Sequence, residues 1–190
     1  MIKELKEGFL FTLVTLVLFG LVYPLLVWGG GRIVFPQKAE GSFLRKADGT
    51  ILGSELVGQA FTRPEYFHGR PSGVNYNAAS TGGTNYGPSN PDHLAAVRER
   101  AAAIVERDGV SLDEIPSDLV TASGGGLDPH ISPAAALIQV ERVARARGAP
   151  AKRVRELVEA HTEGATLGFL GRPRVNVLRL NLALDQEQTQ

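Results

Sequence analysis

An uncharged stretch near the start of the chain constrains its fold more than any other feature. It covers the 24 residues from Gly8 to Gly31, and its apolar part runs from Phe9 to Trp28. A helix of that length spans about 30 Å, the thickness of bilayer hydrocarbon. A cleaved signal peptide has a shorter apolar segment, and a buried soluble helix keeps a polar face. Residues 1–31 are therefore predicted to be a short leader and a permanent single-pass transmembrane helix.

Three details of this helix can be anticipated. The hydroxyls of Thr12 and Thr15 can bond back to helix carbonyls. Pro24 removes one helical hydrogen bond, which predicts a kink in the last turn. The glycines at 29–31 predict a flexible joint between the anchor and the rest of the chain.

The orientation of the helix is not set by charge, because basic residues flank it on both sides. Long domains, however, translocate largely regardless of charge. A short leader with no domain of its own is also typical of a signal anchor. We therefore expect a cytoplasmic amino terminus and a soluble domain, residues 32–190, outside the cytoplasm.

The charge and cysteine content exclude several classes of function. The chain has 20 basic and 20 acidic residues and no cysteine. This balance argues against nucleic-acid binding, and the missing thiols exclude disulfides, iron–sulfur clusters and a cysteine nucleophile. The four histidines are far apart in the sequence, so no metal site is expected.

The soluble domain is predicted to mix helices and strands. A β-hairpin is expected at 42–52, where Asp48-Gly49 supplies the turn. Asn or Ser before Pro is typical of a helix start, because the side chain caps the first turn. Interleaved helices and strands indicate an α/β or α+β fold. Helices are predicted at 91–108, 133–147 and from Pro150 onward, and strands at 118–122 and 175–184.

The segment 58–90 shows neither helical nor strand periodicity. It is rich in Gly, Pro and Asn, contains five aromatic residues, and has Glu65 as its one acid. A loop this long is usually functional or disordered, and its aromatic content favours an ordered surface. Such a composition suits contact with another protein rather than with cations.

A glycine-rich turn precedes the second predicted helix. Ser123 to Gly126 could expose amides to phosphate, but the P-loop pattern and its lysine are missing. Ser123, Asp128 and His130 are too close in sequence for a hydrolase triad, whose members usually come from separate elements. A turn in which Asp128 and Ser123 cap backbone amides fits better. A membrane-anchored extracytoplasmic enzyme or ligand-binding module using Asp128 and His130 stays as the alternative function.

Several long, irregular motifs are distributed over nearly the whole chain, at residues 58–61, 64–67, 69–72, 82–91, 118–123, 126–136 and 175–185. In these motifs the chain resembles one family, the C subunit of the bacterial Kdp-type potassium-transporting ATPase. Gly125 and Tyr86 stand where that family's pattern has Ser and Leu.

The resemblance implies a non-catalytic accessory subunit of an ATP-driven, high-affinity potassium uptake pump. Its partners would be a potassium-channel-like subunit, a P-type ATPase subunit, a small membrane subunit and the lipid bilayer. The family is described as needed for assembly and as a catalytic chaperone that raises the ATPase subunit's affinity for ATP. The implied location is the bacterial inner membrane, with a periplasmic domain over the channel-like subunit.

ATP is cytoplasmic, so an outside domain would act on ATP affinity through subunit packing rather than direct contact. No tightly bound cofactor is expected. Residues 58–90 and 123–130 are predicted to form the docking face. Its candidates are Gln59, Phe61, Tyr66, Phe67, Arg70, Pro71, Ser72, Asn85, Gly87, Pro88 and Asn90. The weaker nucleotide candidates are Ser123, Gly124, Gly125, Gly126, Asp128 and His130.

Overall fold

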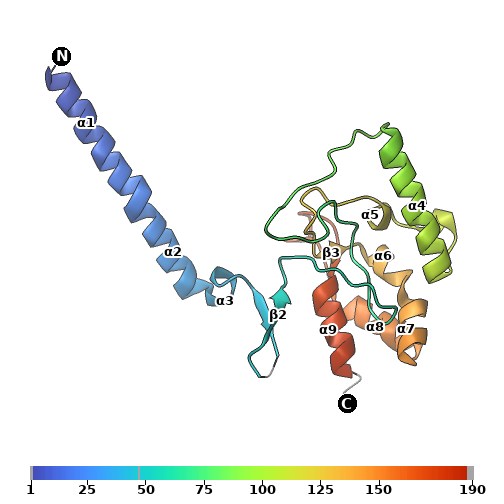
Figure 1. Ribbon diagram of the computed structural model, residues 1–190. Helices are drawn as coiled ribbons and strands as arrows, with labels where there is room; N and C mark the ends of the chain where they lie inside the picture. Colours follow the sequence, from blue (N-terminus) through green and yellow to red (C-terminus); the bar gives the residue numbers. More distant parts are fainter. Residues whose placement is uncertain (1, 47, 188–190) are drawn as a thin grey trace. The chain divides into compact units, whose positions relative to one another are not determined.

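The computed structural model describes residues 2–46 and 48–187, in two compact units, Met1–Leu52 and Gly53–Gln190. In the first unit, α1 (Ile2–Val17), η1 (Leu18–Val22) and α2 (Tyr23–Val34) follow one another without a break (Figure 1). Among the described residues this is the one helix long and apolar enough to cross a membrane. The predicted long apolar helix is confirmed, and its length and composition make it a candidate membrane span.

The details of the membrane helix match the predictions in part. Thr12 and Thr15 donate to the carbonyls four residues earlier, as expected, at 2.8 and 2.9 Å. Just before Pro24 the helix widens into a π turn, in which the Tyr23 N–H reaches the Leu18 carbonyl. A π turn is a common way to relieve a missing helical hydrogen bond.

The glycines at 29–31 do not form a joint. They lie inside α2, which continues to Val34, so this prediction was wrong. Glycine lowers helix propensity but does not forbid a helix that its neighbours propagate. A short helix, α3 (Pro36–Ala39), and a two-stranded hairpin of β1 (Phe43–Arg45) and β2 (Ile51–Ser54) come next, which confirms the hairpin.

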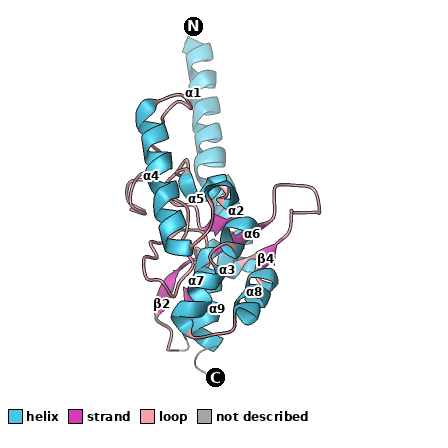
Figure 2. Ribbon diagram, turned by 90° about the vertical axis from the view of Figure 1, so that its right-hand side faces the viewer, coloured by secondary structure: helices cyan, strands magenta, loops and turns pink. Residues whose placement is uncertain are grey.

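The second unit mixes many helices with a small sheet, as the sequence predicted (Figure 2). The order in the sheet is β3-β5-β4, with both neighbouring pairs antiparallel. The elements are α4 (Pro91–Asp108), η2 (Leu112–Glu114), α5 (Ser117–Val120), β3 (His130–Ile131), α6 (Pro133–Leu137), α7 (Val140–Arg147), α8 (Ala151–Ala160), β4 (Thr162–Glu163), β5 (Arg174–Asn176) and α9 (Val177–Glu187).

Both predicted strands need correction. Residues 117–120 form the short helix α5, with the Thr121 N–H bonded to the Ser117 carbonyl at 3.0 Å. Of the predicted strand 175–184, only the first residues belong to β5, and the rest is α9. The buried positions there are 177, 178, 180, 181 and 184, a helical spacing that partial alternation in the sequence concealed.

The predicted helix 133–147 is interrupted by a tightened turn. The N–H of Gln139 bonds three residues back, to Ala136, at 3.0 Å. This turn separates α6 from α7, whereas the predicted starts of α4, α6 and α8 are confirmed. The core of the unit lies where α4, α6, α7, α8, α9 and β5 meet, and Phe67 from the long loop is part of it.

Candidate functional site

The 58–90 loop contains no helix or strand, yet polar side chains from the core hold it firmly. Phe67 is fully buried, and Asn181 of α9 binds both its backbone groups. The Phe67 N–H donates to Asn181 Oδ1 at 2.8 Å, and Asn181 Nδ2 donates to the Phe67 carbonyl at 3.0 Å. Phe67 is therefore a core residue, which corrects its prediction as a docking side chain.

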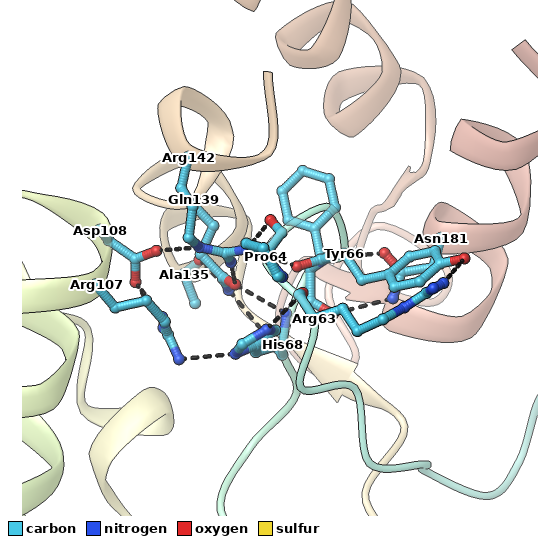
Figure 3. A network of polar contacts seen from close by, with 11 residues as sticks. Arg63, Pro64, Tyr66, His68, Arg107, Asp108, Ala135, Gln139, Arg142 and Asn181 are labelled. Carbon is cyan, nitrogen blue, oxygen red and sulfur yellow. Dashed lines mark hydrogen bonds and ion pairs between the residues drawn. The ribbon is translucent and has the colours of Figure 1, made fainter. Parts of the chain in front are cut away.

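Gln139 binds the next residue of the loop in the same way. The His68 N–H donates to Gln139 Oε1 at 2.8 Å, and Gln139 Nε2 donates to the His68 carbonyl at 3.2 Å. The Gln139 side chain is fully buried and also donates to the Ala135 carbonyl at 3.0 Å. The side-chain amides of Asn181 and Gln139 thus satisfy the backbone groups of two consecutive loop residues, as a neighbouring strand would in a sheet (Figure 3).

Arg142 of α7 forms the centre of this network. Its Nε lies 2.6 Å from Asp108 Oδ1, and its Nη2 donates to Gln139 Oε1 at 2.7 Å. Its Nη1 donates to the carbonyls of Pro64 and Tyr66. Burial lowers the pKa of Arg142, and its ion pair with Asp108 acts in the opposite direction.

His68 is held in its neutral form. Arg107 Nη1 lies 2.8 Å from Nδ1 and can only donate, so Nδ1 accepts. Nε2 then carries the proton and donates to the Arg63 carbonyl at 3.1 Å. Burial, together with the charge of Arg107, lowers the pKa of His68 to about 4.

Tyr66 is also committed to contacts within the chain. Its hydroxyl donates to Asp185 at 3.1 Å and accepts from Arg63 at 2.9 Å. The guanidinium carbons of Arg63 and Arg147 lie 4.9 and 5.0 Å from its ring centroid. Phe61 packs beside it, with the ring centroids 5.5 Å apart. Much of the aromatic content of the loop therefore organises the loop itself.

The glycine-rich turn packs closely against the loop. Ser123 N–H donates to the Pro71 carbonyl at 3.0 Å, and Ser72 Oγ donates to the Gly126 carbonyl at 2.7 Å. A Cβ on Gly126 would lie 2.5 Å from a Val74 methyl, and its φ of +72° already favours glycine. The buried Ser123 and Gly126 thus join the two segments, while Gly124 and Gly125 are exposed.

Asp128 and His130 lie together, with Arg70 beside them. The His130 N–H donates to Asp128 Oδ1 at 3.0 Å, as the predicted capping turn requires. Burial raises the pKa of Asp128, but hydrogen bonds from His130 and the ion pair with Arg70 outweigh it and lower the pKa to about 2. The predicted side-chain cap by Ser123 is not seen in the described part of the chain; instead, the Gly126 N–H donates to the Ser123 backbone carbonyl.

For the enzyme alternative, Asp128 and His130 line a common pocket of about 640 Å³, but its described lining residues do not include Ser123. No hydrogen bond joins Ser123 to His130 in the described part of the chain, and Asp128 is bound to Arg70. No group of three or more metal-ligating side chains was found among the described residues.

The remaining docking candidates divide into three groups. Asn85, Gly87 and Pro88 are exposed, at the end of the loop nearest α4. Asn90 is the N-cap of α4 and accepts from two backbone amides. Gln59, Arg70, Pro71 and Ser72 are half-buried.

A short hairpin between β4 and β5, residues 165–171, was missed by the sequence analysis. Thr166 and Leu170 exchange both backbone hydrogen bonds, at 2.8 and 2.9 Å. Leu167 and Phe169 are 79% and 74% exposed, and Leu170 is also exposed. Leu167 has a φ of +56°, which is unfavourable for a bulky residue. The sequence contains a signal for this hairpin, because apolar residues lie between the glycines at 164, 168 and 171.

The comparisons identify the class to which this anchored chain belongs. The family model KdpC, described as "K+-transporting ATPase, c chain", matches residues 5–186. A potassium-transporting ATPase KdpC subunit of Methylococcus capsulatus is 52% identical over 97% of this chain and 98% of its own length. Similar subunits of Caldanaerobacter subterraneus and Geobacter sulfurreducens are 50% and 51% identical, over 97% and 96% of this chain and 96% and 97% of their own lengths.

The chain therefore belongs to the KdpC family, as its motifs indicated. It is an accessory subunit of a potassium-transporting ATPase, with a candidate membrane-spanning helix near its amino terminus.

Proposed function

We propose that this chain is a non-catalytic accessory subunit needed for assembly of a high-affinity, ATP-driven potassium uptake pump. It would bind the channel-like subunit, the P-type ATPase subunit and the small membrane subunit of the same complex. The observation that carries the proposal is the exposed apolar tip of the 165–171 hairpin on a chain of this family. Contiguous exposed apolar side chains commonly mark a protein contact site.

The strained turn supports a role for the hairpin. Leu167 and Gly168 both have positive φ and lie in the three-residue loop that the Thr166–Leu170 pair closes. A leucine with positive φ destabilises the fold by roughly 1 kcal/mol, and the Leu167 side chain is exposed to solvent rather than packed within the chain. Unfavourable backbone at an exposed apolar tip suggests a contact that the isolated chain does not satisfy.

The docking face proposed from the sequence changes accordingly. Phe67 and Tyr66 hold the loop in place, so their effect on docking would be indirect. The hairpin and the exposed residues Asn85, Gly87 and Pro88 provide the surfaces for direct contact. This arrangement retains the predicted use of the loop but moves the apolar anchors to Leu167, Phe169 and Leu170.

The soluble unit is proposed to lie outside the cytoplasm, over the channel-like subunit. An effect on the affinity of the ATPase subunit for ATP would then be allosteric, passing through subunit contacts. The packing of the turn at 123–126 supports this view. Two of its amides, those of Ser123 and Gly126, are already bonded within the chain.

The test is co-purification of the pump from potassium-starved cells that carry a tagged ATPase subunit. Replacing Leu167, Phe169 and Leu170 together by Ser should release this chain from the complex. Leu112→Ser is the matched control, because Leu112 is 66% exposed on a different element. Equal recovery of the triple variant and the control would contradict docking through the hairpin. Absence of the unmutated chain from the purified pump would favour the independent enzyme or ligand-binding module.

A further inference from the structure

A pocket of about 280 Å³ lies beside α4, apart from the exposed hairpin. Phe61 and Ile104 form part of its apolar wall. Arg70, Arg100 and Arg107 also line it, and the described lining residues include no carboxylate. An apolar pocket with several cations and no acid is suited to an anionic group.

Two of these arginines are held in place by the end of α5. Arg100 Nη1 donates to the Val120 carbonyl at 3.0 Å, and Arg70 Nη2 donates to the next carbonyl, that of Thr121, at 3.4 Å. The Nε of Arg70 is buried and has no hydrogen-bond partner among the described residues. Backbone carbonyls therefore fix both guanidinium groups in position without supplying a full negative charge.

The third arginine belongs to a group with an excess of positive charge. Arg107 and Arg142 share one carboxylate, that of Asp108, whose side chain is wholly buried. His68, which contacts Arg107, is neutral and brings no compensating negative charge. Two cations therefore depend on a single anion on this side of the pocket.

The other side of the pocket adds to the excess. Arg70 is paired with Asp128 at 3.0 Å. Arg100 has no ion pair with a carboxylate in the described part of the chain, and it is half-buried. The three lining arginines and Arg142, which shares Asp108 with Arg107, thus have two carboxylates as ion-pair partners. Partly buried charge without a counter-charge is unfavourable, so an added anion would be stabilising.

We propose that this pocket receives an aspartate or glutamate side chain from another subunit of the pump, with Arg100 as its principal partner. This inference rests on the proposed function, since it requires docking within the complex. At about 280 Å³, the pocket has room for an inserted carboxylate side chain. The apolar wall would exclude water and strengthen the ion pair.

The first test converts the arginine into a reactive amine. A carbodiimide activates a carboxylate, and an adjacent lysine amine then displaces the urea by-product to form an amide; arginine is not coupled in this way. The intact pump carrying Arg100→Lys is treated, and linked peptides are identified by mass spectrometry. Arg98→Lys is the matched control, because Arg98 is exposed on the same helix.

The expected result is a link from position 100, and not from position 98, to an Asp or Glu of another subunit. No link from position 100, or links only within this chain, would overturn the inference while the complex still purifies intact. Failure of the unmutated chain to purify with the pump would instead overturn the proposed function.

A second measurement uses the release of this chain from the immobilised pump by increasing salt. Arg100→Gln should speed dissociation by about tenfold or more, because it leaves the partner's carboxylate unpaired. Arg100→Lys should dissociate much more slowly than Arg100→Gln, and Arg98→Gln should have little effect on the dissociation rate. Release of Arg100→Gln at the same rate as Arg98→Gln would overturn the inference.

Discussion

The guanidinium of Arg142 lies 2.6 Å from the carboxylate of Asp108, and 6% and 0% of the two side chains are exposed. The same guanidinium also donates to the Tyr66 carbonyl and to Gln139. One residue therefore joins α4, α7 and the 58–90 loop. The loop is ordered because its carbonyl groups meet donors supplied by the helices, rather than by strand pairing.

Arg142→Lys should destabilise the chain although the charge is kept. Lysine cannot make the several directed bonds of the guanidinium, so carbonyls of the loop would be left unpaired. We expect the free energy of unfolding to fall by about 2–4 kcal/mol, measured by circular dichroism in urea with the full chain in detergent. Arg98→Lys, at an exposed position, should change it by less than about 0.5 kcal/mol. A similarly small change in the free energy of unfolding for Arg142→Lys would show that the network contributes little to stability.

Gly126→Ala and Gly125→Ala should behave very differently. A Cβ at 126 would lie 2.5 Å from a Val74 methyl and 2.9 Å from the Gly82 carbonyl, at a φ of +72°. A Cβ at 125 meets nothing within 4 Å. We expect Gly126→Ala to lower the free energy of unfolding, measured by thermal denaturation, by roughly 2 kcal/mol or more. Gly125→Ala should leave it nearly unchanged.

The same pair of variants separates packing from nucleotide contact. If the turn acts only by packing, Gly125→Ala should leave the ATP dependence of the assembled pump unchanged. A raised KM for ATP in Gly125→Ala, without loss of stability, would instead support a nucleotide contact at this turn.

Helix starts and turns were predictable because they are local. Asn90 before Pro91 caps α4 through its own side chain, and Gly109 ends that helix with a φ of +71°. Both signals depend on residues next to the boundary, so the sequence carries them without tertiary context. The membrane helix was predictable for a related reason, since an uncharged stretch of this length suits no water-exposed surface.

Which side chains are buried could not be predicted from local sequence signals in the same way. Phe67 was expected at the surface because its segment lacks periodicity, yet Asn181, more than a hundred residues later, fixes it in the core. The sequence of α9 resembles a strand because Leu and Val alternate partly with polar residues. Its side chains contact α8 and β5, and this packing selects the helix. Long-range contacts of this kind leave no local pattern.

His68 should make the stability of the chain depend on pH. Its pKa is about 4 in the folded chain and about 6.5 when unfolded, so the unfolded state takes up the proton first. Stability is therefore fully present above pH 6.5 and falls as the pH decreases towards 4. Allowing for the partial exposure of the ring, we expect a loss of roughly 2 kcal/mol over this window.

His68→Asn isolates this contribution. Asn can still accept from Arg107 through its side-chain oxygen but does not titrate. Urea unfolding of the full chain between pH 7 and 4 should show a smaller decrease for His68→Asn than for the unmutated chain. Parallel curves would mean that His68 does not govern this pH range.

The side of the membrane can be determined because the chain has no cysteine of its own. Leu112→Cys places a thiol at a 66% exposed position of the second unit, at a residue that is not among the proposed contact residues. Lys3→Cys places one in the first turn of the membrane helix, ahead of its apolar part, where the side chain is 87% exposed. With an impermeant maleimide on intact spheroplasts, we expect labelling at 112 and labelling at 3 only after lysis. The reverse pattern would place the unit in the cytoplasm, make direct contact with ATP feasible, and exclude docking over the outer entrance of the channel-like subunit.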